Sequence, residues 1–302
     1  MSEAGRPPLY VVALGGNVIS PPRGDLSFAT ERAVIDRAGA ELAALARSGV
    51  RLLVVHGNGP QVGRLLEARG LGDPASLDVH VAQTQGELGY LLAEALDTRL
   101  GRDACVAVVT RVLVDERDPA FAHPTKPIGA VLDAPPTDAP AAPAPDGRGW
   151  RRVVASPRPV EVIEQSAIAA LLATHHVVAG GGGGVALAGP RASRRARPAV
   201  IDKDWVAGLL AAALSAHHLL FVTDVSGAFD RFGQAEQREI HAMSVAEARA
   251  RLAAGIFAPG SMAPKVQAAV EFAEATGRPA VITTIGSLDA ALGGTAGTTI
   301  QP

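Results

Sequence analysis

Six short apolar runs, separated by longer helical patterns, constrain the fold of this chain most. The runs are rich in valine and leucine and lack polar alternation, which predicts strands with both faces buried. Two of the helical patterns stop at glycine, the favoured residue just past a helix end. Alternating strands and helices of this kind predict an α/β layered fold with a mostly parallel sheet covered by helices. The predicted strands are 9–14, 50–56, 104–110, 175–180, 217–223 and 279–285, and the predicted helices are 30–49, 86–101, 204–216 and 263–277.

One segment, from about 112 to 158, interrupts this rhythm. It is rich in proline and has little helical period, and its centre reads DAPPTDAPAAPAPDGRG at 133–149. Part of it is predicted to be a mobile or polyproline-like linker. Because its flanks, 118–129 and 149–159, are less repetitive, we interpret the segment as an excursion inserted into the sheet.

Composition and charge exclude several classes of protein. The net charge of −2 over 302 residues leaves no basic surface for nucleic acid, and the arginine-rich run at 191–197 is interpreted as a solvated loop. The first ten residues do not have the pattern of a signal peptide, and no apolar run approaches the length of a membrane span. Cys105 is the only cysteine, so an internal disulfide is impossible, and we expect a small buried side chain. A cytoplasmic protein is expected.

Four glycine-rich loops follow predicted strands. In open α/β sheets ligands gather at the carboxyl ends of strands, and glycine lets backbone N–H groups approach a phosphate closely. One such loop is weak evidence, because glycine after a strand is common turn geometry, but four in one sheet favour an anion site. No P-loop motif is present, and the run of five glycines is not a dinucleotide fingerprint. The loops are 14–17, 56–63, 180–184 and 258–265.

Lysine is rare in this chain, and its positions are informative. Of 28 basic residues, only Lys126, Lys203 and Lys265 are lysine, and all three lie in loops or helix starts marked by proline, glycine or aspartate. Chance could place them there. However, an ammonium is more compact than the planar guanidinium and suits a small oxyanion held by backbone amides. Because phosphoryl transfer depends on positioning and charge neutralisation, the lysines favour a phosphate role.

Asp202 and Asp204, on either side of Lys203, have two interpretations. Either residue can cap a helix N-terminus, and either can orient the ammonium or meet a magnesium ion held mainly by phosphates. The histidine pairs His175/His176 and His217/His218 each precede an apolar run, which does not favour a metal site.

The chain resembles the carbamate kinases of the amino acid kinase family. The resemblance is collinear over almost the whole length and includes ALGGN (13–17), HGNGPQVG (56–63), AQTQGELGY (82–90), DPAFAHPTKPIG (118–129), GWRRVVASPRP (149–159), GGGG (181–184), VIDKD (200–204), TDVSG (223–227) and FAPGSMAPK (257–265). It implies a three-layer sandwich in a single domain, 1–302. The N-terminal lobe would span about 1–190, with a protruding subdomain at about 112–158, and the nucleotide-binding lobe about 191–302.

The resemblance also implies an activity and roles for residues. The expected reaction interconverts carbamoyl phosphate and ADP with carbamate and ATP, uses Mg²⁺, and serves ATP formation in the catabolism of arginine or related compounds. A homodimer is expected. The expected catalytic residues are Lys126, Lys203, Asp204 and Lys265; those for phosphate and carbamate are Gly15, Gly16, Asn17, Gly57, Asn58, Gly59, Gly181 and Gly182; and those for the nucleotide are Thr223, Asp224, Val225, Ala258, Pro259, Gly260, Ser261 and Met262.

Several positions depart from the family pattern. Ala130 and Ala155 replace usual prolines, Pro198 replaces a common glutamate, and 223–233 is looser than the family's nucleotide segment. None of these removes a lysine, so activity is expected. Two alternatives stay open: a kinase for another small carboxylate on the same fold, and a catalytically silent nucleotide-binding regulator. The regulator would be expected to lose charge at the site.

Overall fold

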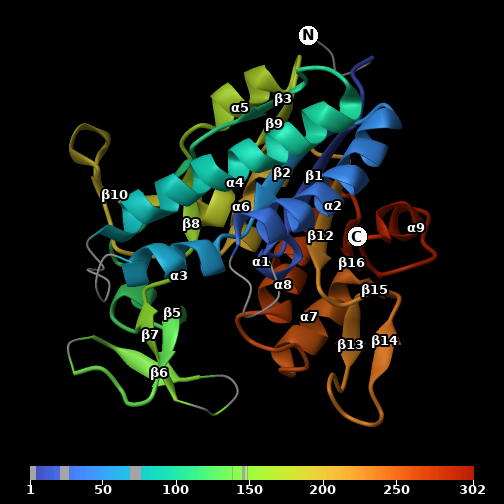
Figure 1. Ribbon diagram of the computed structural model, residues 1–302. Helices are drawn as coiled ribbons and strands as arrows, with labels where there is room; N and C mark the ends of the chain where they lie inside the picture. The colour runs from blue at the N-terminus through green and yellow to red at the C-terminus, as the bar shows by residue number, and fades with distance from the viewer. Residues whose placement is uncertain (1–4, 21–26, 69–75, 138, 145–146, 148) are drawn as a thin grey trace.

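A central sheet with helices on both faces dominates the protein (Figure 1). The computed structural model describes residues 5–20, 27–68, 76–137, 139–144, 147 and 149–302. The sheet has eight strands, and all neighbours are parallel except β16 and β17. In spatial order the strands are β15 (Ala242–Ser244), β17 (Thr298–Gln301), β16 (Ala280–Thr284), β12 (His218–Thr223), β1 (Leu9–Leu14), β2 (Arg51–His56), β9 (His176–Val178) and β3 (Cys105–Ala107).

The helices end where the sequence provides termination signals. α4 and α8 are each followed by a left-handed glycine, Gly101 and Gly277, because glycine adopts positive φ without a Cβ penalty. The side chain of Ser27 caps the start of α2 by accepting a hydrogen bond from Thr30 N–H. The helices are α1 (Gly16–Ile19), α2 (Phe28–Arg47), α3 (Gly59–Ala68), α4 (Leu77–Leu100), α5 (Gln165–Leu171), α6 (Lys203–Ala213), α7 (Val245–Ala253), α8 (Met262–Thr276) and α9 (Leu288–Leu292).

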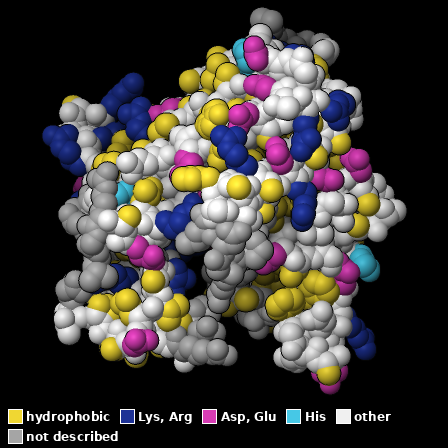
Figure 2. Space-filling view, in the orientation of Figure 1, with side chains coloured by type: hydrophobic (Ala, Val, Ile, Leu, Met, Phe, Trp, Pro, Cys, Tyr) yellow, Lys and Arg dark blue, Asp and Glu magenta, His cyan; other side chains and the backbone are white. Residues whose placement is uncertain are grey.

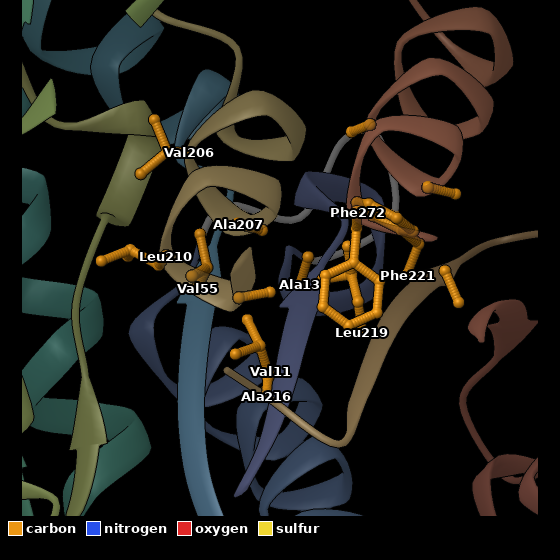
Figure 3. Close-up of a cluster of buried hydrophobic side chains, with 14 of the residues drawn as sticks. Val11, Ala13, Val55, Val206, Ala207, Leu210, Ala216, Leu219, Phe221 and Phe272 are labelled. Carbon is orange, nitrogen blue, oxygen red and sulfur yellow. The ribbon is translucent and has the colours of Figure 1, made fainter. Parts of the chain in front are cut away.

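Alternate residues of the central strands enter two different cores, which confirms that both faces of the sheet are buried. Val12 and Leu14 of β1 pack with the apolar sides of α2 and α4. Val11 and Ala13 of the same strand pack with α6 and α8, including Phe272 (Figure 3). Because successive side chains of a strand point to opposite faces, an unbroken apolar run requires two covering layers. The expected three-layer architecture is therefore confirmed.

A smaller sheet leads from the central sheet toward the inserted segment. Its spatial order is β11 (Arg195–Ala196), β10 (Val185–Ala188), β4 (Arg111–Val114) and β8 (Pro159–Val162). The arginine-rich run 191–197 was predicted to be a solvated loop, but Arg195 and Ala196 form β11, which pairs with β10. Arg191 and Arg195 are exposed.

The inserted segment forms a subdomain that projects at the lower left of Figure 1. It is an antiparallel sheet in the order β5 (Lys126–Leu132), β7 (Trp150–Val154) and β6 (Ala141–Pro143). β6 lies inside the proline–alanine tract, so this part of the predicted linker is a paired strand, while residues 138, 145–146 and 148 of the tract lie outside the described residues. The hairpin of β13 (Ala228–Asp230) and β14 (Arg238–Ile240) makes a second projection, and Figure 2 shows a gap between the two.

The six predicted strands and four predicted helices all form, with shifted ends. The strand expected at 104–110 is only three residues long, and the helix expected at 86–101 starts at Leu77. Cys105, which was expected to be buried, is only partly buried. This partial burial raises the pKa of its thiol to about 12. Among the described helices, none has the length and hydropathy to cross a bilayer.

Candidate active site

The site begins where three neighbouring strands end. The last residue of β1, Leu14, pairs with His56 of β2 and with Val222 of β12, so the loops after these strands start side by side. Gly15 N–H donates to the Val222 carbonyl at 2.8 Å, and Gly57 N–H donates to the Leu14 carbonyl at 3.0 Å.

The approach of these loops requires glycine. A Cβ on Gly57 would lie 2.8 Å from the backbone nitrogen of Gly16 and 3.5 Å from Cε of Lys203. The first and second glycine loops and Lys203 therefore lie side by side.

Two lysines share one buried carboxylate at the start of α6. Lys203 Nζ lies 2.5 Å from Oδ1 of Asp204, and Lys265 Nζ lies 3.0 Å from Oδ2. Lys265 also donates to the Ser261 carbonyl at 3.3 Å. None of the three ionic side chains is more than 10% exposed, so this cluster, Lys203–Asp204–Lys265, holds one excess positive charge in a poorly hydrated place.

The pKa directions follow from this sharing. Burial lowers the pKa of Lys203 more than Asp204 raises it. Burial also opposes protonation of Lys265, but the charge and hydrogen bond of Asp204 outweigh it and raise that pKa. For Asp204, burial alone would raise the pKa, whereas the two ammonium groups lower it to about 2. The carboxylate is therefore ionised at neutral pH.

The third lysine reaches the cluster from the subdomain. Lys126, the first residue of β5, places Nζ 3.0 Å from Oδ2 of Asp202 and is 29% exposed. The other oxygen of Asp202 accepts the Asp204 N–H at 3.0 Å and caps α6. Asp202 is thus the helix cap, and its hydrogen-bonded ion pair is with Lys126 rather than with Lys203.

The five-glycine loop packs against the second glycine loop. Gly182 has φ +60°, and a Cβ there would lie 2.1 Å from the side-chain nitrogen of Asn58. That amide donates to the Thr84 hydroxyl at 2.9 Å. Gly181 lies against the ring of His56, whose pKa burial lowers to about 4, so the imidazole is neutral. Asn58, Gly181 and Gly182 therefore pack together on one side of the site.

A further contact joins the first glycine loop to the loop after β12. Asn17 Nδ2 donates to Asp224 at 2.9 Å, and the Thr223 hydroxyl donates to the other carboxylate oxygen at 3.0 Å. Burial raises the pKa of Asp224, but these hydrogen bonds lower it overall. Residues expected to hold phosphate and residues expected to hold nucleotide thus meet here.

The remaining expected residues lie in the loops and helix starts that follow the strands. Gly59 starts α3 and Val225 follows Asp224, while the exposed turn before α8 contains Ala258, Pro259, Gly260 and Ser261, with Met262 as the first residue of α8. Within this turn, the Ser261 carbonyl accepts a hydrogen bond from Lys265 of the cluster. Their contact with a nucleotide stays a prediction.

The carboxylates near the site have different availability for a cation. No group of three or more metal-ligating side chains occurs in the described part of the chain. Asp202 and Asp204 are each paired with lysine, which disfavours the magnesium interpretation for them. Asp224 is exposed. One exposed carboxylate that forms no ion pair with lysine suits Mg²⁺ that is held mainly by phosphates.

Sequence reasoning assigned no role to His56 or Thr84, and it did not pair Asp202 with Lys126. His56 supports Gly181, Thr84 holds Asn58, and Asp202 holds Lys126. All three lie inside motifs that were recognised, but Thr84 and Asp202 act through partners 26 and 76 residues away. No local sequence pattern predicts a hydrogen bond between residues so far apart in the chain.

Comparison with known proteins places these motifs in context. The model of the amino acid kinase family matches residues 8–284. A carbamate kinase of Halobacterium salinarum is 41% identical, with 97% of this chain and 98% of the relative covered. A carbamate kinase of Lentilactobacillus hilgardii is 38% identical over 96% of both chains. The solved carbamate kinase from Giardia lamblia bound to AMP-PNP is 34% identical, with a TM-score of 0.89 and 98% of both chains covered.

Proposed function

The chain belongs to the amino acid kinase family, and from this premise we propose that it is a carbamate kinase acting reversibly on carbamoyl phosphate and ADP. The observation that carries the proposal is the buried Lys203–Asp204–Lys265 cluster, with its excess positive charge beside two glycine loops. A silent regulator would not need two desolvated ammonium groups at the phosphate loops. A kinase for a larger acid would need an additional anchor, and the sequence offers no clear candidate.

The chemistry fits a site without a general base. One P–O bond to the carbamate oxygen breaks and one P–O bond to the terminal phosphate oxygen of ADP forms. With all groups ionised, both sides of the reaction carry the same charge and no proton is released or taken up. The protein must therefore position two anions and neutralise their charge, which is what phosphoryl transfer demands. Burial lowers the pKa of His56 to about 4, so this histidine is a weak proton acceptor. That is consistent with a reaction that requires no proton acceptor.

In this proposal the lysines surround the transferred phosphoryl group. Lys203 and Lys265 stabilise its oxygens from the cluster, while Asp204 keeps both ammonium groups protonated and oriented. Lys126 approaches from the subdomain. Backbone N–H groups of Gly16, Gly59, Gly181 and Gly182, with the amides of Asn17 and Asn58, hold phosphate and carbamate. The N–H groups of Gly15 and Gly57, which were also expected to donate, are bonded to backbone carbonyls, so these two glycines shape the loops instead. Thr223, Asp224, Val225 and 258–262 hold the nucleotide.

We include Mg²⁺ bound with the nucleotide phosphates. When bound, it neutralises phosphate charge and orients the terminal groups. Asp224 is the residue of this chain that would hold it or its water shell, and Asn17 fixes that carboxylate.

The cellular setting is also proposed. We infer a homodimer in the cytoplasm that supplies ATP during the catabolism of arginine or related nitrogen compounds. The dimer and the pathway rest on the family resemblance.

The test is magnesium-dependent ATP formation from ADP with a panel of phosphoryl donors. Carbamoyl phosphate is expected to support turnover, whereas acetyl phosphate and glutamyl phosphate analogues are expected to support little. Asp204→Asn serves as the site control and should abolish most of the signal, which excludes a contaminating kinase. ATP formation from another donor would indicate a different acid kinase. ADP binding without ATP formation from any donor would indicate a regulator.

A further inference from the structure

Arg158 occupies a constrained place at the base of the subdomain. It lies between Pro157 and Pro159, both buried, while its own side chain is exposed. Proline fixes its own φ and restricts the residue before it, so the backbone of Arg158 is held from both sides. The segment connects β7, the middle strand of the subdomain, to β8 of the smaller sheet.

The backbone of Arg158 joins the segment that enters the subdomain (the entering limb) to the segment that leaves it (the returning limb). Its N–H donates to Oδ2 of Asp118 at 2.9 Å, and Oδ1 of the same aspartate accepts the Ala120 N–H at 2.8 Å. Asp118 belongs to the limb that enters the subdomain, and Arg158 to the limb that leaves it. The two limbs are thereby joined.

The side chain of Arg158 reaches both helices that carry the buried cluster. Its guanidinium carbon lies 3.7 Å from the ring centroid of Trp205, the residue after Asp204 in α6. Its Nη2 donates at 2.8 Å to Glu271 of α8, the helix that carries Lys265. One side chain thus contacts the subdomain base, α6 and α8.

Energetics indicate that these contacts orient more than they stabilise. Arg158 and Glu271 are 52% and 41% exposed, and exposed ion pairs contribute about 0–1 kcal/mol. A cation–π contact adds about 0.5–2 kcal/mol. These values are small for a protein of this size, but they are comparable with the energy that sets the rotation of a small subdomain.

The rotation of the subdomain relative to the rest of the protein is fixed mainly by side chains. A single backbone bridge joins Ala155 to Ala199, with Val200 N–H donating to the Ala155 carbonyl at 3.0 Å. In addition, Ile128 of β5 and Val154 of β7 pack with Val62 and Leu66 of α3 in a small apolar cluster. Lys126 pairs in register with Val154, four residues before Arg158, so turning the returning limb also moves Lys126.

We propose that Arg158 is a positioning residue that docks the subdomain on α6 and α8 and so holds Lys126 over the Lys203–Asp204–Lys265 cluster. The proposal rests on the proposed function, because its kinetic test uses phosphoryl transfer. Asp202 holds Lys126 directly, the apolar cluster holds the subdomain on α3, and Arg158 adds the contact with α6 and α8.

The kinetic test is a double-mutant cycle of Arg158→Ala and Lys126→Met. In the wild-type background Arg158→Ala is expected to lower kcat about 10- to 100-fold, because a misplacement of about 1 Å can cost that much. In the Lys126→Met background the same change should cost less than about twofold, since the group that Arg158 positions is absent. Arg158→Lys, which keeps the charge but loses the planar stacking, should fall between.

The matched control is Arg249→Ala. Arg249 and Glu274 form an ion pair between α7 and α8 with exposures of 53% and 40%, close to those of Arg158 and Glu271. Its loss should leave kcat unchanged. An equal loss for Arg158→Ala in both backgrounds, or no loss at all, would overturn the proposal.

A fluorescence readout separates failure of this proposal from failure of the proposed function. The chain has two tryptophans, so Trp150→Phe leaves Trp205 as the sole reporter of the Arg158 contact. Addition of ADP with carbamoyl phosphate is expected to shift its emission, and Arg158→Ala should abolish the shift. An unchanged shift would contradict the positioning role. Absence of ATP formation by the wild-type protein would instead contradict the proposed function, whatever the emission does.

Discussion

At the scale of single residues, one carboxylate organises the centre of the site. The single charge of Asp204 is shared by two ammonium groups, so one positive charge is left unneutralised. The phosphoryl group can neutralise it. This arrangement keeps buried charge tolerable before the substrate binds, because an unpaired buried ammonium would be very costly. It also makes the site sensitive to any change in the number of charges.

Replacement of each lysine by methionine is therefore expected to lower turnover about 10²–10³-fold, the usual cost of losing one charge-stabilising donor. Methionine retains an apolar stem, so Lys126→Met, Lys203→Met and Lys265→Met should stay folded. Steady-state kinetics with circular dichroism on the same samples checks both statements. Near-normal turnover in all three variants would contradict the proposed mechanism.

The pKa directions predict the alkaline side of the rate profile. Burial lowers the pKa of Lys203, while Asp204 opposes this effect. Without the Asp204 carboxylate, only the charge of Asp202 opposes burial and the repulsion between Lys203 and Lys265. Asp204→Asn should therefore move the alkaline fall in kcat of the residual activity to lower pH. An alkaline limb at the same pH in both proteins would exclude Lys203 as the titrating group.

His56 predicts an acid-sensitive stability. Its pKa is about 4 in the folded protein and near 6.5 when unfolded, so the unfolded state binds the proton more tightly between these values. The free energy of unfolding should thus fall by roughly 3 kcal/mol as pH drops from 6.5 to 4. Denaturant titration at several pH values should show a smaller fall in His56→Asn. The exposed His123→Asn is the control and should resemble the wild type.

At the scale of elements, predictability depended on where the information lies. The six apolar runs identified six strands of the central sheet, because burial on both faces is written into consecutive residues. β15 and β17 were missed, since AMS and TTIQ are short and partly polar. β5 was missed because KPIGAVL contains proline and glycine. Among site residues, rarity exposed the lysines, whereas the partners of Lys126 and Arg158 are distant in sequence.

The glycine loop offers an element-scale prediction with a built-in comparison. Gly182 and Gly255 have φ values of +60° and +68°, so alanine at either position incurs about 1–2 kcal/mol of left-handed strain. Only at Gly182 does the new Cβ meet Asn58, because nothing lies within 4 Å at Gly255. Gly182→Ala should therefore lose both stability and turnover, whereas Gly255→Ala should lose stability alone. Equal turnover of the two variants would show that Asn58 does not matter.

At the scale of the whole molecule, the two proposed lobes share one sheet. β1 of the N-terminal lobe pairs with β2 on one side and with β12 of the nucleotide-binding lobe on the other. The sheet is therefore continuous across the boundary near 190. We therefore expect a single cooperative unfolding transition, with equal calorimetric and van't Hoff enthalpies. ADP at 100 times its Kd should shift that whole transition by about 2.7 kcal/mol. Two separate transitions, with only one moved by ADP, would indicate lobes that unfold independently.

The central position of β1 also has a consequence during biosynthesis. Tyr10 leaves the ribosome early, but its neighbour His218 is added about 200 residues later, which takes about 10–40 s at ordinary elongation rates. Until then one edge of an apolar strand has no native partner and can pair with another nascent chain. The yield of native protein should therefore depend on translation speed and on chaperones that shield this edge, even though the finished enzyme buries it completely.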